Sequence, residues 1–347
     1  MLYYEGLEEV IFSKHELLSE EPDELVVISG FLGPAPVERL NELSDMKITV
    51  IGGMYPSGLD ARLWSSLEKI SKESDHIDIL FTNCEIHSKI YIWKKQGKTL
   101  GALIGSANFS SNGLRTDYRE SLADATRDTF APLDTYYKFV LDNSSGEPQF
   151  RKDQAVIDYS SMKQGKDIAN LEIQLSFDIP IYDPRTDEVP VSSGLNWGLA
   201  RLNGAHTAEG DAYIRLPKEI IKEVPGLISP LDPTFSTPEG KRKRNSDPIE
   251  LIWDDGTIME ASLEGEQKHD GKQYPKQLAS YSPKTPFLDG KRISKKSILG
   301  RYLRNRLGVD VDDLITKEIL DNYGRNTITL SLIGEGVYFA DFSVKDN

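Results

Sequence analysis

The sequence predicts a layered α/β domain followed by a mainly β domain. In the first half of the 347 residues, short apolar runs alternate with stretches whose apolar residues recur at helical spacing. From Leu171 onward, short apolar segments are separated by proline and glycine, which is typical of a barrel or sandwich. Residues 147–168, between the two patterns, are mostly polar. We therefore expect a first domain over residues 1–168, with its linker at about 147–168, and a second over 169–347.

The first half is expected to alternate helices and strands up to its most informative segment. The expected order is helix 2–18, strand 25–31, helix 34–43, strand 47–51, helix 59–70 and strand 77–81. This alternation predicts a largely parallel sheet with helices on its faces. Beyond residue 120 we expect a strand to Ala125 and a helix over 130–141, in which Pro132 fits the first turn.

The second half is expected to be built from short strands. The predicted strands cover residues 171–177, 212–216, 249–253, 257–264, 327–333 and 337–342. Two amphipathic patterns, over 295–306 and 311–322, predict helices between the fourth and fifth of these strands.

Residues 86–93 alternate between apolar and other side chains, which predicts a strand. Two residues apart on a strand, His87 and Lys89 would project from the same face, roughly 6 to 7 Å apart. A polar turn and a second apolar run follow, and that run ends in Gly105, Ser106, Ala107 and Asn108. If the two strands pair, an imidazole, an ammonium, a hydroxyl and a carboxamide converge. One nucleophile or proton carrier with three donors suits a phosphate group.

The pattern H-x-K followed by G-S-x-N resembles the phospholipase D superfamily. The resemblance implies that His87 attacks a phosphodiester, that Lys89 and Asn108 hold the phosphate, and that Ser106 adds a donor. Two features depart from the usual pattern. The superfamily's aspartate position is occupied by Lys94, and fifteen residues separate Lys89 from Gly105.

Restriction endonucleases of the NgoFVII, NgoAVII and BfiI kind resemble this variant, including an acidic residue shortly after the asparagine. Glu120 fits that residue best, and Asp117 is the alternative. The resemblance implies a phospholipase D-like α/β/α layered domain and a type II-like restriction endonuclease. Such an enzyme would hydrolyse double-stranded DNA through a covalent phosphohistidine, without a metal or other cofactor. The chain holds one H-x-K, so the resemblance also implies a homodimer that completes the site. Systems of the NgoAVII and CglI kind act beside a separate ATP-hydrolysing subunit, which is a possible partner here.

The second half resembles the plant B-three-like DNA-binding pseudobarrel of BfiI and EcoRII, in its order of strands, basic loop and two helices and in SSGLNWG at 192–198. In that fold, two loops grip the major groove. The first would be 192–207 and the second 264–277. Side chains of the types that match base edges occur in both loops. These candidate DNA-binding residues are Asn196, Trp197, Arg201, Asn203, Gln267, Lys268, Lys272 and Gln273.

The charge distribution agrees with a localised polyanion site. The chain has a net charge of −14, yet residues 265–306 hold eleven basic and three acidic residues. A second basic run, 241–244, is expected to contact phosphate or solvent. The single cysteine, Cys84, excludes an internal disulfide framework and a cysteine-rich zinc cluster. No membrane-spanning run or secretion signal is recognisable, so we expect a cytoplasmic protein that does not act on membranes.

Three other functions compete with this interpretation. A metal-dependent nuclease could use Asp254 or Asp255 with Glu266 and Lys268, in a loose D...E-x-K pattern. A lipid-cleaving phospholipase usually carries two H-x-K motifs. A DNA-binding regulator with an inactive nuclease fold would have no need for the complete set of His87, Lys89, Ser106 and Asn108.

Overall fold

The computed structural model describes residues 1–151, 175–232, 234–235 and 246–344. These residues form two compact units. The first unit contains residues 1–153 together with 333–337, and the second contains 154–332 together with 338–347. Most of the expected linker and the whole basic run 241–244 lie outside the described residues.

The first unit is built on an eight-stranded sheet with the order β1-β7-β6-β5-β2-β3-β4-β8. Its strands are β1 (Leu2–Tyr3), β2 (Glu24–Ser29), β3 (Lys47–Gly52), β4 (Ile77–Thr82), β5 (Lys89–Lys95), β6 (Lys98–Gly105), β7 (Leu122–Asp124) and β8 (Ser144–Ser145). The central strands β2, β3 and β5 are almost fully buried, because their apolar residues meet helices on both faces of the sheet.

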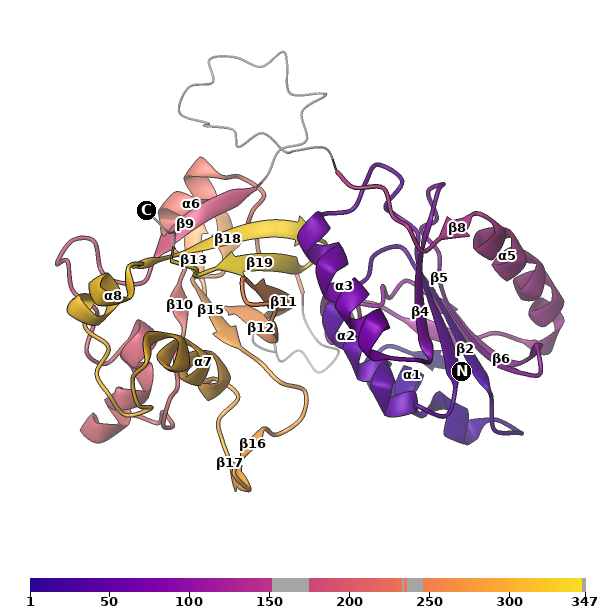
Figure 1. The fold of residues 1–347 in the computed structure, drawn as a ribbon, viewed down its shortest axis with the longest axis horizontal. Helices are drawn as coiled ribbons and strands as arrows, with labels where there is room; N and C mark the ends of the chain where they lie inside the picture. Colours follow the sequence, from indigo (N-terminus) through magenta and orange to yellow (C-terminus); the bar gives the residue numbers. More distant parts are fainter. Residues whose placement is uncertain (152–174, 233, 236–245, 345–347) are drawn as a thin grey trace, which may run out of the picture. The chain divides into compact units, whose positions relative to one another are not determined.

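Helices cover the two faces of this sheet (Figure 1). The helical segments are α1 (Leu7–Ser13), η1 (Lys14–Leu17), α2 (Pro34–Arg39), η2 (Leu40–Leu43), α3 (Ala61–Glu73), α4 (Ser111–Leu114), η3 (Arg127–Thr129) and α5 (Phe130–Asp142). Helix α5 packs Leu133 and Val140 against Ile28, Ile92 and other apolar residues of the sheet. Helices α1, α2 and α3 lie on the opposite face, so the predicted α/β/α layering is confirmed.

The prediction of a largely parallel sheet is wrong. Only β2–β3 and β3–β4 pair in parallel among the strand pairs of this sheet. Strands β5 and β6 are joined by the tight Gln96-Gly97 turn and pair antiparallel, and β7 returns antiparallel beside β6 after a loop that contains α4. The predicted entry helix over 2–18 is also wrong in part, because this segment forms the short strand β1, the seven-residue helix α1 and the 3-10 segment η1.

The second unit contains a seven-stranded sheet with the order β10-β15-β12-β11-β19-β18-β9. Its strands are β9 (Ser176–Pro180), β10 (Ile214–Arg215), β11 (Asp247–Trp253), β12 (Ile258–Glu264), β15 (Gln277–Ser280), β18 (Thr327–Gly334) and β19 (Val337–Asp341). The edge strands β9 and β10 are not paired with each other in this order, so the sheet is an open barrel. This agrees with the predicted mainly β pseudobarrel.

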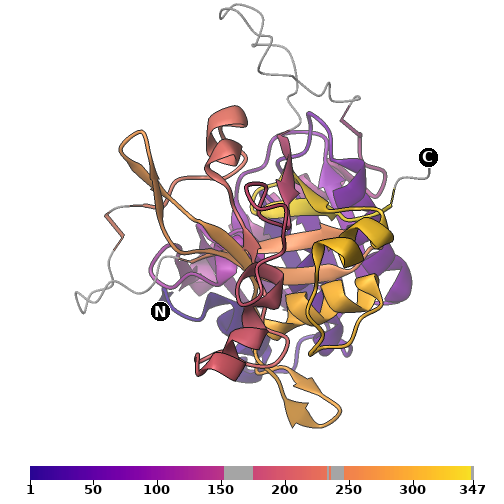
Figure 2. The same ribbon diagram turned by 90° about the vertical axis from the view of Figure 1, so that its left-hand side faces the viewer.

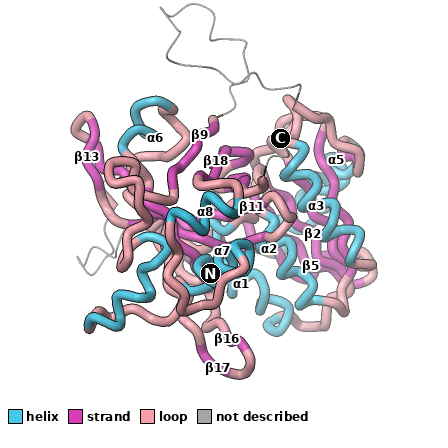
Figure 3. Tube along the Cα trace, turned by 60° about the vertical axis from the view of Figure 1, so that its left-hand side comes forward, coloured by secondary structure: helices cyan, strands magenta, loops and turns pink. Residues whose placement is uncertain are grey.

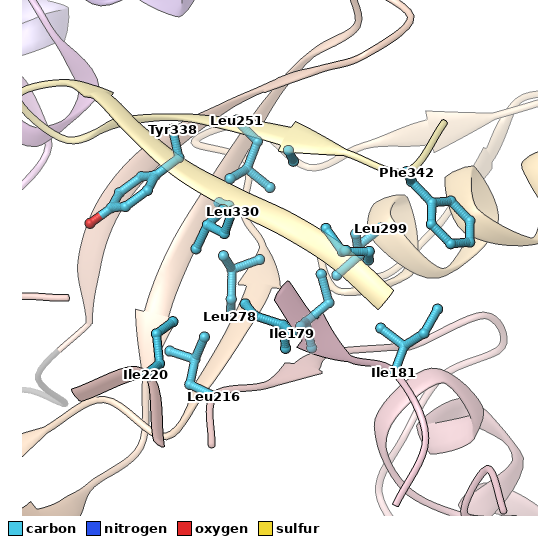
Figure 4. Packing of buried hydrophobic residues seen from close by; sticks show 14 of the residues in the cluster. Ile179, Ile181, Leu216, Ile220, Leu251, Leu278, Leu299, Leu330, Tyr338 and Phe342 are labelled. Atoms are coloured by element: carbon cyan, nitrogen blue, oxygen red, sulfur yellow. The ribbon is translucent and has the colours of Figure 1, made fainter. Parts of the chain in front are cut away.

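The core of this barrel is apolar and gathers residues from every strand of the sheet and from the helices. Ile179, Leu251, Leu278 and Leu330 meet there with Phe342 (Figure 4). The helical segments around it are η6 (Gly194–Asn203), α6 (Lys218–Glu223), α7 (Ser297–Leu307) and α8 (Lys317–Tyr323). Helix α8 begins at Lys317 and not at residue 311 as predicted. Thr316 supplies its N-cap by accepting a hydrogen bond from the Ile319 amide.

Two small hairpins extend from the second unit in different directions (Figures 2 and 3). One pairs β13 (Gln267–His269) with β14 (Lys272–Tyr274), and the other pairs β16 (Phe287–Leu288) with β17 (Lys291–Arg292). The first lies within the predicted second DNA-binding loop. The second was not predicted.

Candidate active site and nucleic-acid interface

His87 and Lys89 lie at the start of β5, but only Lys89 belongs to the strand. The predicted strand over 86–93 is therefore wrong at its first residues, since residues 83–88 form a loop. His87 is exposed on that loop, whereas Lys89 is only 5 % exposed. The Lys89 ammonium nitrogen donates to the His87 carbonyl at 2.6 Å. The loop thus presents the imidazole to solvent while the strand holds the lysine beneath it.

The side chains of His87, Lys89 and Asn108 converge over Gly30. A Cβ placed on Gly30 would lie 3.1 Å from His87 Cδ2 and 3.2 Å from both Lys89 Nζ and Asn108 Oδ1. The three atoms are consequently no more than about 6.4 Å apart, which is twice 3.2 Å. Gly30 follows β2, which pairs with β5, and sequence reasoning missed it. A glycine directly after a buried strand is the signal that could have identified it.

The orientation of the Asn108 side chain is set by the end of β2. Its Oδ1 accepts hydrogen bonds from the Phe31 amide (3.2 Å) and the Ser29 hydroxyl (3.5 Å). A backbone N–H can only donate, so the Oδ1 end of the carboxamide must face β2 and the Nδ2 end must face away. Nδ2 donates to Glu335 Oε2 at 2.9 Å, within the first unit. This donor therefore holds an anionic oxygen in the structure.

Glu120 and Asp117 occupy different surroundings. Asp117 Oδ1 accepts a hydrogen bond from the Gly6 amide at the start of α1. The pKa of the Lys89 ammonium is lowered because burial disfavours its charged form, and the carboxylates of Glu335 and Glu120 oppose this shift. Glu120 is thus close enough to act electrostatically on the site, and Asp117 is committed to a helix terminus. The arrangement favours Glu120 over Asp117 as the supporting carboxylate.

Ser106 supports the turn that carries Asn108. Its hydroxyl oxygen accepts from the Ser121 amide (3.1 Å), and its own amide donates to the Ser121 carbonyl (3.0 Å). These bonds tie the turn to the residue after Glu120. On the other side of the turn, the buried Tyr91 hydroxyl donates to the Ala107 carbonyl at 2.9 Å. Ser106 is therefore placed to hold Asn108 and Glu120 together, in addition to the donor role that we expected.

Lys94 stands where the phospholipase D pattern has an aspartate, and the structure shows what it contacts. Its side chain is buried and donates to Asp134 of α5 at 2.6 Å. Thr99 of β6 donates to the same carboxylate. A carboxylate is thus present near this position, but it comes from the helix and the cation comes from the strand. The contact joins β5, β6 and α5 on the sheet face covered by α5.

In the first predicted DNA-binding loop, Asn196 and Arg201 make polar contacts within the unit. Asn196 is fully buried, donates to the carbonyls of Pro190 and Ile315, and accepts from the Ile315 amide. The prediction that it reads bases is wrong, because its hydrogen-bonding groups are used inside the unit. Arg201 is half-buried and forms an ion pair with Asp312.

The other two candidates of this loop differ in exposure. Trp197 is half-buried and packs edge to face on Tyr213, with ring centroids 5.5 Å apart, so it anchors the loop. Asn203 lies exposed at the end of η6. Asn203 is therefore the accessible polar candidate in the first loop.

The second predicted loop is the β13–β14 hairpin. Gln267 is half-buried and donates its side-chain Nε2 to the carbonyls of Leu216 and Pro275, so this group holds the base of the hairpin, and contact of Gln267 with a base stays a prediction. Lys268 and Lys272 are exposed, and Gln273 is half-buried. Lys268 is paired with Gln273 in the ladder, so these two side chains share one face of the hairpin.

The residues of the metal-dependent alternative are not arranged as metal ligands. Asp254 receives two hydrogen bonds from the Arg306 guanidinium and one from the Phe342 amide. Asp255 accepts from the Tyr302 hydroxyl. Within the described ranges, no three His, Cys, Asp or Glu side chains are grouped so that they could hold a metal ion. No helix in those ranges is long and apolar enough to cross a membrane.

Family comparisons match both units. Residues 5–157 match the model described as the NgoFVII restriction endonuclease N-terminal PLD domain. Residues 167–334 match the NgoFVII C-terminal B3-like DNA-binding domain. Together the two matches cover nearly the whole chain. No curated protein matches the sequence.

Solved structures that resemble part of the chain include the following three. NucT from Helicobacter pylori is 17 % identical, with 41 % of this chain and 91 % of NucT covered and a TM-score of 0.31. A polyphosphate kinase from Porphyromonas gingivalis is 12 % identical, with 44 % of this chain and 25 % of the kinase covered and a TM-score of 0.30. A yeast tyrosyl-DNA phosphodiesterase mutant is 14 % identical, with 32 % of this chain and 27 % of the phosphodiesterase covered and a TM-score of 0.23. These scores are too low to carry a structural argument.

Proposed function

We propose that this chain, which belongs to the NgoFVII family of restriction endonucleases, cleaves double-stranded DNA through a covalent phosphohistidine and without a metal ion. The observation that carries the proposal is the convergence of His87, Lys89 and Asn108 over Gly30. An exposed imidazole, a buried ammonium and an oriented carboxamide donor are the groups that attack on a phosphodiester requires.

In the proposed reaction, a neutral His87 nitrogen attacks phosphorus and forms a P–N bond while the bond to the leaving oxygen breaks. Lys89 and Asn108 Nδ2 donate to the nonbridging oxygens, where negative charge increases in the transition state. Water then attacks the phosphohistidine and gives its proton to the histidine that protonated the leaving oxygen, the P–N bond breaks and His87 is regenerated. Glu120 would orient the imidazole and stabilise the charged intermediate through the other ring nitrogen.

The proposal predicts that cleavage persists in an excess of EDTA. The charge that a metal would supply comes from Lys89, and Asp254 and Asp255 are engaged by Arg306 and Tyr302. The measurement is the rate of duplex cleavage by the full-length chain after dialysis against chelator, compared with untreated protein. Equal rates are expected. Loss of activity that magnesium restores would refute metal independence while leaving the nuclease assignment intact.

The proposal also includes a homodimer, because the leaving oxygen needs a proton donor and the described site contains one histidine. His87 of the partner subunit would supply that proton. The prediction is that, after co-refolding, His87→Ala subunits inactivate the wild-type subunits with which they dimerise. With a ninefold excess of His87→Ala, about one-tenth of wild-type subunits meet another wild-type subunit, so activity per wild-type subunit falls about tenfold.

The control for this mixing experiment is a ninefold excess of His76→Ala, which removes an imidazole elsewhere in the first unit. Because His76→Ala subunits keep His87, activity per total subunit should then equal that of wild type alone. If the excess of His87→Ala leaves activity per wild-type subunit unchanged, each chain works alone and the dimeric site is refuted. Sedimentation of the wild-type chain gives the oligomeric state independently.

We further propose that the second unit reads the target sequence, with Asn203, Lys268, Lys272 and Gln273 as its accessible candidates. Asparagine and glutamine can form bidentate contacts with adenine, and each good bidentate contact contributes roughly 1 to 3 kcal/mol of discrimination. Trp197 and Arg201 are assigned to positioning the first loop, since both are engaged within the unit. Selection of bound duplexes from a random library gives the target sequence.

A further inference from the structure

The β16–β17 hairpin carries two apolar side chains that are exposed to solvent. Phe287 is 66 % exposed and Leu288 is 45 % exposed. The turn between the strands is Asp289-Gly290, and both residues have positive φ, 49° and 73°. Two central residues of positive φ make the tight turn that suits the twist of a two-stranded ribbon. The local backbone thus forms a defined ribbon that extends from the second unit (Figure 3).

Two cations lie on the return strand of this ribbon. Arg292 is paired with Phe287 in the ladder, and Lys291 is paired with Leu288. Paired residues share a face, so each face of the ribbon presents one apolar and one cationic side chain. Both cations are exposed, and neither forms an ion pair within the described residues.

The cations of the following helix are used differently. Arg301 pairs with Glu209 and Arg306 pairs with Asp254. Arg304 is 2 % exposed, and Lys296 pairs with Glu264. The basic stretch over 265–306 therefore includes structural cations on and just before α7 and unpaired cations on or beside the two hairpins. Across the described part of that stretch, the exposed cations without an ion pair include Lys268, Lys272, Lys276, Lys291 and Arg292.

The segments on either side of the ribbon in the chain contact or lead into the two DNA-binding loops. The β13–β14 hairpin leads into β15, and the ribbon follows β15 in the chain. After the ribbon, the Lys296 carbonyl accepts from the Ala212 amide at 3.3 Å. Arg301 and Glu209 form a second link between α7 and the end of the first loop. The ribbon is thus connected directly to the elements that hold both loops.

We propose that the β16–β17 ribbon is a third DNA contact, which grips the duplex beside the sequence that the two loops read. Lys291 and Arg292 bind backbone phosphates, and Phe287 and Leu288 pack against the sugars and base edges of the adjoining groove. A protein partner would cover a continuous apolar face, whereas these two apolar side chains lie on opposite faces, each beside a cation. The inference rests on the proposed recognition of DNA by the second unit.

The test compares binding of long and trimmed duplexes. The full-length chain carries His87→Ala so that DNA stays uncut, and the probe holds the selected site with about one helical turn, 10 base pairs, of flank on each side. Lys291→Ala/Arg292→Ala is expected to weaken binding roughly tenfold and to flatten the slope of log K against log salt by about 1.8, at about 0.9 per phosphate contact. On a duplex trimmed on the contacted side, the double variant and its parent should bind equally.

The control is Lys218→Ala/Lys222→Ala, which removes two exposed lysines of α6 at the opposite end of the second unit (Figure 1). Its affinity for the long duplex and its salt dependence should equal those of its parent. The proposal is overturned if the ribbon variant loses the same factor on long and trimmed duplexes, or if it changes only the oligomeric state. If the parent selects no sequence, target recognition fails. The ribbon is then tested by the same slope on a random-sequence duplex of equal length.

Discussion

A His87→Ala protein is expected to bind its target duplex as tightly as wild type and to cleave it at least about 10⁴-fold more slowly, as removal of a covalent nucleophile commonly does. The imidazole is exposed on the loop before β5, and its ring makes no hydrogen bond to the residues that the structure describes. Its loss should therefore remove chemistry and leave stability unchanged. The measurement is single-turnover cleavage together with thermal unfolding.

Covalent trapping distinguishes a nucleophile from a general base. Wild-type protein quenched during turnover should carry a DNA adduct that is stable to denaturant and labile in acid, and His87→Ala should carry none. Lys89→Ala should slow cleavage by roughly 10² to 10³-fold, as loss of one transition-state donor does. Cleavage by His87→Ala within tenfold of wild type would exclude the covalent mechanism, while an inactive His76→Ala would show that the loss is not specific to the site.

The grouping of the candidate catalytic residues could be predicted because they lie on or next to two strands that are adjacent in sequence. Lys89 and Gly105 are paired in the β5–β6 ladder, so the residues after Gly105 necessarily lie near the start of β5. A hairpin brings such residues together with little dependence on the rest of the fold. For this reason the convergence was predictable even though the strand begins two residues after His87.

The DNA-binding residues were harder to predict, because residue type does not show whether a polar side chain in a loop is free or structural. Asn196 and Gln267 have the amide groups that read adenine, and the same groups satisfy buried backbone carbonyls here. Buried carbonyls require partners, and the partner is decided by three-dimensional packing between segments far apart in the chain. Ile315, which bonds Asn196, is 119 residues away in sequence.

Two further differences between prediction and structure concern the β16–β17 hairpin and the direction of the strands in the first sheet. The Asp289-Gly290 dipeptide is a strong hairpin signal, and its flanks are two apolar and two basic residues. The parallel sheet was predicted from alternation of helices and strands alone. That pattern fits only β2, β3 and β4, because β5 and β6 form a hairpin and β7 returns antiparallel beside β6 after the short helix α4.

Substitution of Gly30 is expected to slow cleavage about as strongly as loss of Lys89. Its φ lies outside the left-handed region, so a residue with a side chain can adopt this backbone without strain. The new Cβ would stand 3.1 to 3.2 Å from His87 Cδ2, Lys89 Nζ and Asn108 Oδ1, in the space between the catalytic groups. Asn108 cannot move away easily, since its Oδ1 is bonded to the Phe31 amide.

Gly30→Ala should therefore reduce cleavage by about 10²-fold through misplacement of the catalytic groups, and Gly30→Val should reduce it further, to about 10³-fold. DNA binding by the second unit and the thermal midpoint of Gly30→Ala should stay close to wild type. Gly146→Ala is the matched control, because a Cβ there meets nothing closer than Leu80 Cδ2 at 3.9 Å and its φ is also outside the left-handed region. Wild-type cleavage by Gly30→Val would show that phosphate does not bind between His87, Lys89 and Asn108. The reaction would then have to take place elsewhere in the first unit.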